Sequence, residues 1–171
     1  APGCLWLLLS QPTISGKSLT LRGDDGTTFF VWTSSATSRG LVFTATTADQ
    51  RFVLDGIGLL NQGQGATALT LSGPWVASST ARQASVTNVL IGGFNPSQDN
   101  WAYGVQQTNI WGARYAHITV RGRDGAPEAM VTGFVVMGKS VGVTWVETQV
   151  FNGYLGYWVR GGEAEGGVWS Y

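Results

Sequence analysis

The sequence predicts an all-β domain folded as a right-handed parallel β-helix, a solenoid in which successive turns of the chain stack along one axis. Glycine accounts for 25 of the 171 residues, about twice the ~7% of an average protein. Helical periodicity is scarce, because Gly, Pro, Ser and Thr interrupt almost every short window. The remaining apolar residues lie in many short runs, and several of these runs alternate with polar residues, as half-buried strands do.

The strands are expected where these runs occur. Leu69 and Leu71 place two apolar side chains on one face, and Ile118 and Val120 do the same. The apolar run from Cys4 to Leu9 predicts a buried strand, with Cys4 as a buried and unreactive thiol. Further strands are expected at residues 18–22, 40–44, 51–55, 88–91 and 141–146.

A degenerate repeat favours a solenoid over a sandwich or a barrel. Gly104, Gly133 and Gly156 each open an apolar run, at steps of 29 and 23 residues. Such uneven steps suit stacked turns that differ in the length of their loops. Hairpins are not indicated, because the Asp-Gly steps at 25–26, 55–56 and 124–125 are not flanked by matched strands. We expect these aspartates to stabilise turns.

The length suits one domain, and we expect residues 1–171 to form a single β-helix domain. The open ends of a solenoid expose strand edges and require caps. No cap is evident, since the chain begins with apolar residues and we expect its end, at 168–171, to lie within a strand. We therefore expect a fragment of a longer β-helix, truncated at both ends.

The composition restricts the function classes. Ten basic and ten acidic residues give a formal net charge of zero, so a nucleic-acid-binding patch is not indicated. Charged residues make up only 12% of the chain, which leaves a surface of small polar groups and aromatic rings suited to sugars or to contact with other subunits. With one cysteine and one histidine, we expect no disulfide, no metal site and no cofactor. No apolar run is long enough for membrane insertion.

Several motifs resemble those of pectate-lyase-like β-helices in bacteriophage tailspikes. The segment 16–27 (GKSLTLRGDDGT) followed by the apolar run 29–32 resembles their opening turns. Segments 88–94, 103–122 and 161–166 resemble later turns, in the same order along the chain. The resemblance covers residues 13–171, and it departs from the family in lacking a tail-attachment head domain and a C-terminal trimerisation segment.

This resemblance implies a homotrimer on the virion tail, outside the bacterial cell and in contact with other phage tail proteins. It further implies that the chain binds a bacterial surface polysaccharide and helps to depolymerise it. Two alternatives remain open at this point. One is a secreted bacterial polysaccharide lyase or hydrolase of the same fold, and the other is a structural β-solenoid without catalytic activity.

The candidate catalytic residues are Glu163 and Glu165, since cleavage of sugar chains commonly uses two carboxyl groups. They lie two residues apart between glycines, and in extended backbone they face the same side. An apolar wall such as Trp158 would raise the pKa of one of them and make it a general acid. The alternative is that both are solvated residues of a turn.

The candidate glycan-binding residues are aromatic rings with a polar neighbour. Trp158 and Arg160 are two residues apart, so a strand presents a stacking plane and a carboxylate anchor on one face. Trp101 and Tyr103 follow a polar loop at 95–100 that we expect to be exposed. Such rings also fill solenoid cores and subunit interfaces. For His117 we favour a hydrogen-bonded structural role.

Overall fold

The computed structural model describes residues 4–24, 26–36, 39–74, 82–160 and, for the backbone alone, 168–170. It confirms an all-β fold of stacked parallel strands. Short strands form because Gly, Asn and Asp end each run after a few residues. In the described residues, the only helical segment is the 3₁₀ turn η1 (Pro127–Ala129), and none of these residues forms a helix that is long and apolar enough to cross a membrane.

Two sheets make up the solenoid, and every strand pair within them is parallel. The six-stranded sheet contains β2 (Thr13–Ser15), β5 (Leu41–Thr44), β8 (Gln64–Ser72), β10 (Asn100–Thr108), β12 (Thr132–Met137) and β15 (Leu155–Arg160). The ten-stranded sheet contains β1 (Leu5–Leu8), β3 (Leu19–Arg22), β4 (Thr28–Trp32), β6 (Phe52–Asp55), β7 (Ile57–Asn61), β9 (Ala84–Gly93), β11 (Ala113–Arg121), β13 (Thr144–Val146), β14 (Gln149–Phe151) and β16 (Val168–Ser170).

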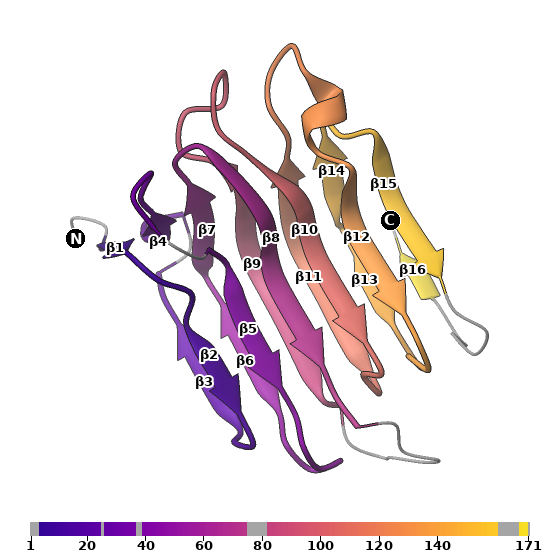
Figure 1. The fold of residues 1–171 in the computed structure, drawn as a ribbon. Helices are drawn as coiled ribbons and strands as arrows, with labels where there is room; N and C mark the ends of the chain where they lie inside the picture. The colour runs from indigo at the N-terminus through magenta and orange to yellow at the C-terminus, as the bar shows by residue number, and fades with distance from the viewer. Residues whose placement is uncertain (1–3, 25, 37–38, 75–81, 161–167, 171) are drawn as a thin grey trace.

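Each turn crosses the six-stranded sheet once and then runs along the ten-stranded sheet, so that the turns stack from β1 at one end to β16 at the other (Figure 1). The ten-stranded sheet has two halves. The first part of β9 pairs with β6 and its last part pairs with β7. In the same way β11 pairs with β13 and then with β14. A corner therefore separates the two halves in every turn, and it is this corner that positions the candidate site.

The core lies between the two sheets and contains stacked aromatic rings. The rings of Trp32 and Trp101 meet edge to face with centroids 5.4 Å apart. The rings of Phe134 and Tyr157 stack with centroids 5.1 Å apart. Since one turn cannot bury its own apolar face, the columns of side chains along the axis supply the burial that holds the turns together.

The glycine repeat predicted from the sequence is confirmed as a column through three turns. The registers place Gly104 beside Gly133 and Gly133 beside Gly156. A Cβ on Gly104 would lie 2.5 Å from the carbonyl oxygen of Gly133, and one on Gly133 would lie 2.8 Å from that of Gly156. Gly104 and Gly133 are therefore glycine because the backbone of the next turn approaches too closely for a side chain.

The structure corrects two expectations about the N-terminal segment. Residues 5–8 do form a strand, β1, but Trp6 is 58% exposed and its neighbours are exposed as well. Cys4 is likewise exposed and not buried. The reason is positional, because β1 is the outermost strand of its sheet among the described residues and pairs only with β4.

Candidate functional site

A row of backbone positions with positive φ marks the corner of the ten-stranded sheet. The φ angles are 67° at Gly56, 54° at Asn88, 52° at His117 and 47° at Glu147. The registers place these four residues beside one another in successive turns, since Asp55 pairs with Thr87, Thr87 with Ala116 and Ala116 with Val146. In these four turns the corner is thus built from one left-handed residue per turn.

Left-handed backbone suits glycine and asparagine, which occupy two of the four positions, but it is unfavourable for other residues. At His117 and Glu147 the conformation costs on the order of 1–2 kcal/mol each. Non-glycine residues with strained backbone are enriched at functional sites. His117 and Glu147 are therefore candidate functional residues.

The side chains along this corner hold one another across turns. Oδ1 of Asp55 accepts hydrogen bonds from Oγ1 of Thr87 at 2.7 Å and from Nδ2 of Asn88 at 2.9 Å. Nδ1 of His117 lies 2.8 Å from Oε2 of Glu147 in the next turn. We call Asp55, Asn88, His117 and Glu147 the corner row. It joins carboxylates, an amide and an imidazole along the solenoid axis.

The histidine of the corner row is oriented by the carboxylate of Glu147. A carboxylate that accepts the Nδ1 proton leaves Nε2 as the free acceptor of a neutral imidazole. The His117 side chain is 49% exposed and that of Glu147 is 60% exposed, so both side chains are accessible to a ligand. The pair can exchange hydrogen bonds with the hydroxyl groups of a ligand.

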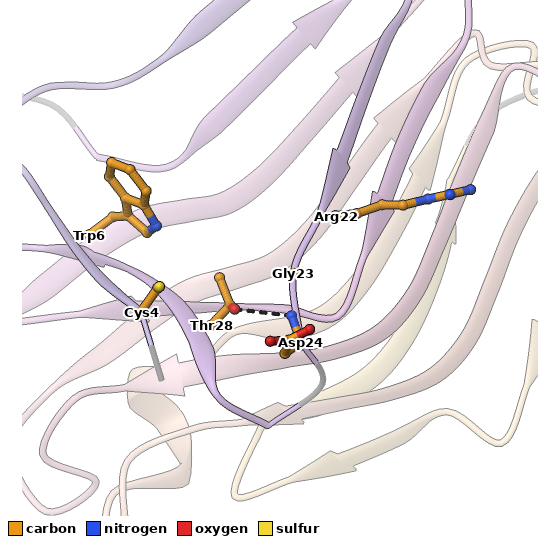
Figure 2. Close-up of a pocket in the computed structure, with 6 residues that line it drawn as sticks. All are labelled: Cys4, Trp6, Arg22, Gly23, Asp24 and Thr28. Carbon is orange, nitrogen blue, oxygen red and sulfur yellow. Dashed lines mark hydrogen bonds between the residues drawn. The ribbon is translucent and has the colours of Figure 1, made fainter. Parts of the chain in front are cut away.

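A hollow lies at the N-terminal end of the same corner. Its volume is about 360 Å³, and Figure 2 shows the residues that line it, which are Cys4, Trp6, Arg22, Gly23, Asp24 and Thr28. The backbone N–H of Asp24 donates to Oγ1 of Thr28 at 3.0 Å, which holds the turn beside the hollow. Trp6 offers an exposed ring at this end, while Arg22 extends away from it in the view of Figure 2.

Gly23, which lines the hollow, lies in the same column of residues as the corner row, and we call this column the strip. The N–H of Gly23 donates to the carbonyl oxygen of Asp55 at 2.9 Å, and that of Gly56 donates to the carbonyl oxygen of Thr87 at 3.1 Å. Gly23 therefore occupies the corner position one turn before Gly56. With strands spaced by about 4.8 Å, four steps from Gly23 to Glu147 span roughly 19 Å. A strip of this length suits an extended polymer better than one small molecule.

The structure brings together Trp158 and Arg160, the predicted sugar-binding pair. Both lie on β15, and the guanidinium carbon of Arg160 lies 5.3 Å from the centroid of the Trp158 ring. The Trp158 side chain is 36% exposed. The spacing of two residues thus places both groups on one face, but the cation already covers part of the ring face that a sugar would use.

Trp101 does not lie where its neighbouring loop suggested. Its side chain is 1% exposed, and its Nε1 donates to the carbonyl oxygen of Leu59 at 3.2 Å. The ring fits inside because its strand neighbour is Gly65, where a Cβ would lie 2.4 Å from the ring. Trp101 therefore packs in the core and offers no face to a sugar. Tyr103, on the same strand, is half-buried between Thr67 and Thr132 in the register.

The predicted catalytic residues Glu163 and Glu165 lie outside the described residues, and their pairing stays a prediction. Within the described part of the chain, no group of three or more His, Cys, Asp or Glu side chains is arranged to hold a metal ion. His117 is paired with Glu147 through Nδ1, and the structural role expected for it stays a prediction. The sequence carried no signal for that pairing, because the two residues meet only through the stacking of turns.

No protein-family model, no curated protein and no solved structure matches this chain in the comparisons with known proteins. The functional argument therefore depends on the geometry of the solenoid and its corner.

Proposed function

We propose that this chain is a receptor-binding β-solenoid segment that binds an extended bacterial surface polysaccharide along the corner row, in the manner of a phage tailspike, and helps to depolymerise it. The observation that carries the proposal is the pairing of His117 with Glu147 at strained, exposed corner positions. Asn88 occupies the same corner position one turn earlier, and Asp55, one residue before the corner of the preceding turn, accepts a hydrogen bond from it, so that hydrogen-bonding groups recur once per turn.

Three further features support a carbohydrate ligand. The chain has a net charge of zero, so its overall charge does not attract a strongly charged polymer. Carboxylate, amide and imidazole groups exchange hydrogen bonds with hydroxyl groups readily. The Trp6 ring, which pairs with the core-facing Phe30, is exposed at the open N-terminal end of the solenoid and offers a flat apolar surface on which a sugar face can stack.

The proposal includes the setting that the family resemblance implies. The chain acts outside the bacterial cell, on a virion tail, as part of a homotrimer that contacts other tail proteins. Cleavage of the bound polysaccharide requires a group that transfers a proton, and the Glu147-oriented His117 is the described group best arranged for it. Glu163 and Glu165 stay as candidate acids beside it.

The test measures binding of a panel of bacterial surface polysaccharides by titration calorimetry, with the parent chain, His117→Gln and Asn88→Gly, since glycine keeps the positive φ of residue 88 without strain. We expect both variants to weaken binding at least tenfold while the unfolding midpoint changes little. Thr144→Ala, on β13 away from the corner row, is the control and should bind as the parent does. If the parent binds none of the panel, or if both corner variants bind as it does, the proposal is wrong.

Cleavage is measured on the same samples by two readouts. Hydrolysis releases reducing ends alone, whereas elimination also produces an unsaturated sugar that absorbs in the ultraviolet. Glu163→Gln and Glu165→Gln are compared with His117→Gln in both assays. If only His117→Gln abolishes cleavage, the two glutamates are residues of a turn.

A further inference from the structure

The hydrogen bonds within the corner row use most of its donors. The hydroxyl of Thr87 and one N–H of Asn88 both donate to Oδ1 of Asp55, at 2.7 and 2.9 Å. A neutral imidazole has a single N–H, and that of His117, at Nδ1, lies 2.8 Å from Oε2 of Glu147. A ligand at the row therefore meets one remaining donor, which is the second N–H of Asn88.

The atoms left unused along the row are acceptors. None of the following has a hydrogen-bond partner among the described residues: Oδ2 of Asp55, Oδ1 of Asn88, Nε2 of His117 and Oε1 of Glu147. Asp55 and Asn88 are half-buried, and the other two side chains are more exposed. With turns spaced by about 4.8 Å, the three steps from Asp55 to Glu147 span roughly 14 Å. A row of acceptors of this length selects a ligand that is rich in donors.

The two carboxylates of the row have no lysine or arginine partner among the described residues. Arg22 is the neighbour of Asp55 in the register of β3 and β6, yet no ion pair joins these two residues. Arg114 lies three residues before His117 on β11, and no ion pair joins it to Glu147. Although the whole chain has a net charge of zero, the row thus has an uncompensated carboxylate near one end and a carboxylate bound only to imidazole at the other.

We propose that the polysaccharide bound along the corner row is a polymer of amino sugars whose residues carry free amino groups. This inference rests on the proposed function and names the substrate class of the same site. An ammonium group supplies a positive charge and N–H donors, which suit the carboxylates of Asp55 and Glu147 at the two ends of the row. The hydroxyl groups of the same sugars suit the neutral acceptors of Asn88 and His117 between them.

Two other kinds of charged polymer fit the row less well. A polymer of sugar acids would place carboxylates against Asp55 and Glu147, where like charges repel each other. A lysine-rich peptide carries ammonium groups, but its side chains offer no hydroxyl donors to Asn88 and His117. The order of carboxylate, two neutral acceptors and carboxylate therefore favours a sugar that carries both kinds of donor.

The test measures binding of four defined probes by titration calorimetry, which are hexamers of glucosamine, N-acetylglucosamine, galacturonic acid and lysine. The first two probes differ only in acetylation of the nitrogen, so their comparison isolates the ammonium group. We expect the glucosamine hexamer to bind at least tenfold more tightly than the N-acetylated and lysine hexamers. The galacturonic acid hexamer should show no measurable binding.

Glu147→Gln tests the contribution of one carboxylate. Glutamine keeps an oxygen that can accept from Nδ1 of His117 but removes the negative charge. This variant should reduce the preference for the glucosamine hexamer over its N-acetylated form at least threefold. Glu128→Gln, at an exposed residue of η1, makes the same chemical change outside the row and should leave that preference unchanged.

The inference is overturned by a parent chain that binds the glucosamine hexamer no more tightly than any one of the other three, or that binds none of the four. It is equally overturned if folded Glu147→Gln keeps the parent's preference, and the comparison of probes on the parent decides the matter if that variant does not fold. The proposed function is decided separately. If His117→Gln and Asn88→Gly weaken binding of a neutral or acidic polysaccharide while the parent shows no preference for glucosamine, the proposed function stands and the amino-sugar inference is wrong.

Discussion

Gly104 lies so close to Gly133 of the next turn that a Cβ on Gly104 would be 2.5 Å from the carbonyl oxygen of Gly133 and 2.6 Å from Cγ1 of Val120. Gly104→Ala should therefore lower the free energy of unfolding by about 1–3 kcal/mol, the usual effect of an overfilled core. Urea unfolding followed by tryptophan fluorescence measures this change in the free energy of unfolding.

Gly156 provides the matched control in the same column. The nearest atom to an added Cβ there is Cβ of Val150, at 4.0 Å. Gly156→Ala should change the stability by less than about 0.5 kcal/mol. Equal urea midpoints for the two alanine variants would show that the column is not closely packed at Gly104.

A second prediction concerns a buried hydroxyl group. The hydroxyl of Tyr115 donates to Oε1 of Gln107 at 2.6 Å, and both side chains are buried. Tyr115→Phe leaves the Gln107 oxygen without this donor, which should cost about 1–3 kcal/mol of stability. Thermal unfolding of the parent and of Tyr115→Phe gives the difference in stability. Tyr154→Phe, at a residue that is 73% exposed, is the control.

The same tyrosine predicts a dependence on alkaline pH. Burial raises the pKa of Tyr115 well above its ordinary value near 10. Below pH 10 the phenol is protonated in both states and adds no pH dependence. Above it the unfolded state loses the proton and the folded state keeps it, so stability falls by about 1.4 kcal/mol per pH unit. Stability measured from pH 9 to 11 should fall less steeply in Tyr115→Phe than in the parent.

A further prediction tests the placement of Trp101. Trp101→Phe removes the hydrogen bond to Leu59 and part of the contact with Trp32, so it should destabilise the fold by about 1–3 kcal/mol. It should leave polysaccharide binding unchanged at temperatures where the variant is folded. Trp158→Phe, at the partly exposed ring of β15, should change the stability by less than about 1 kcal/mol. A large loss of sugar binding in Trp101→Phe alone would contradict the buried placement.

The last prediction concerns Asp49, whose pKa lies below its ordinary value. The first cause is the hydrogen bond from Oγ1 of Thr47 to its Oδ1, at 2.5 Å. Thr47→Ala should raise the pKa of Asp49 toward the ordinary value. Titrations of the parent and of Thr47→Ala, followed by NMR of the carboxyl carbon, measure the pKa of Asp49 in each. The stabilising effect of this bond is present at neutral pH and is lost as the pH falls through the lowered pKa.

The sequence alone determined the features that depend on local residue type and spacing. Gly104, Gly133 and Gly156 marked successive turns, and the alternation of Leu69 and Leu71 marked inward positions, because backbone approach and strand geometry act over a few residues. The spacing of Trp158 and Arg160 placed them on one face for the same reason.

Only the tertiary structure decided which residues meet across turns and which side chains are covered. His117 and Glu147 face each other because the register of β11 and β13 aligns two left-handed residues, and no local pattern encodes that register. Trp101 turns inward because Gly65, in the neighbouring strand, leaves space for its ring. Cys4 and β1 are exposed because, among the described residues, no strand pairs with the outer edge of β1. Burial is a property of neighbours, and in a solenoid the neighbours come from other turns.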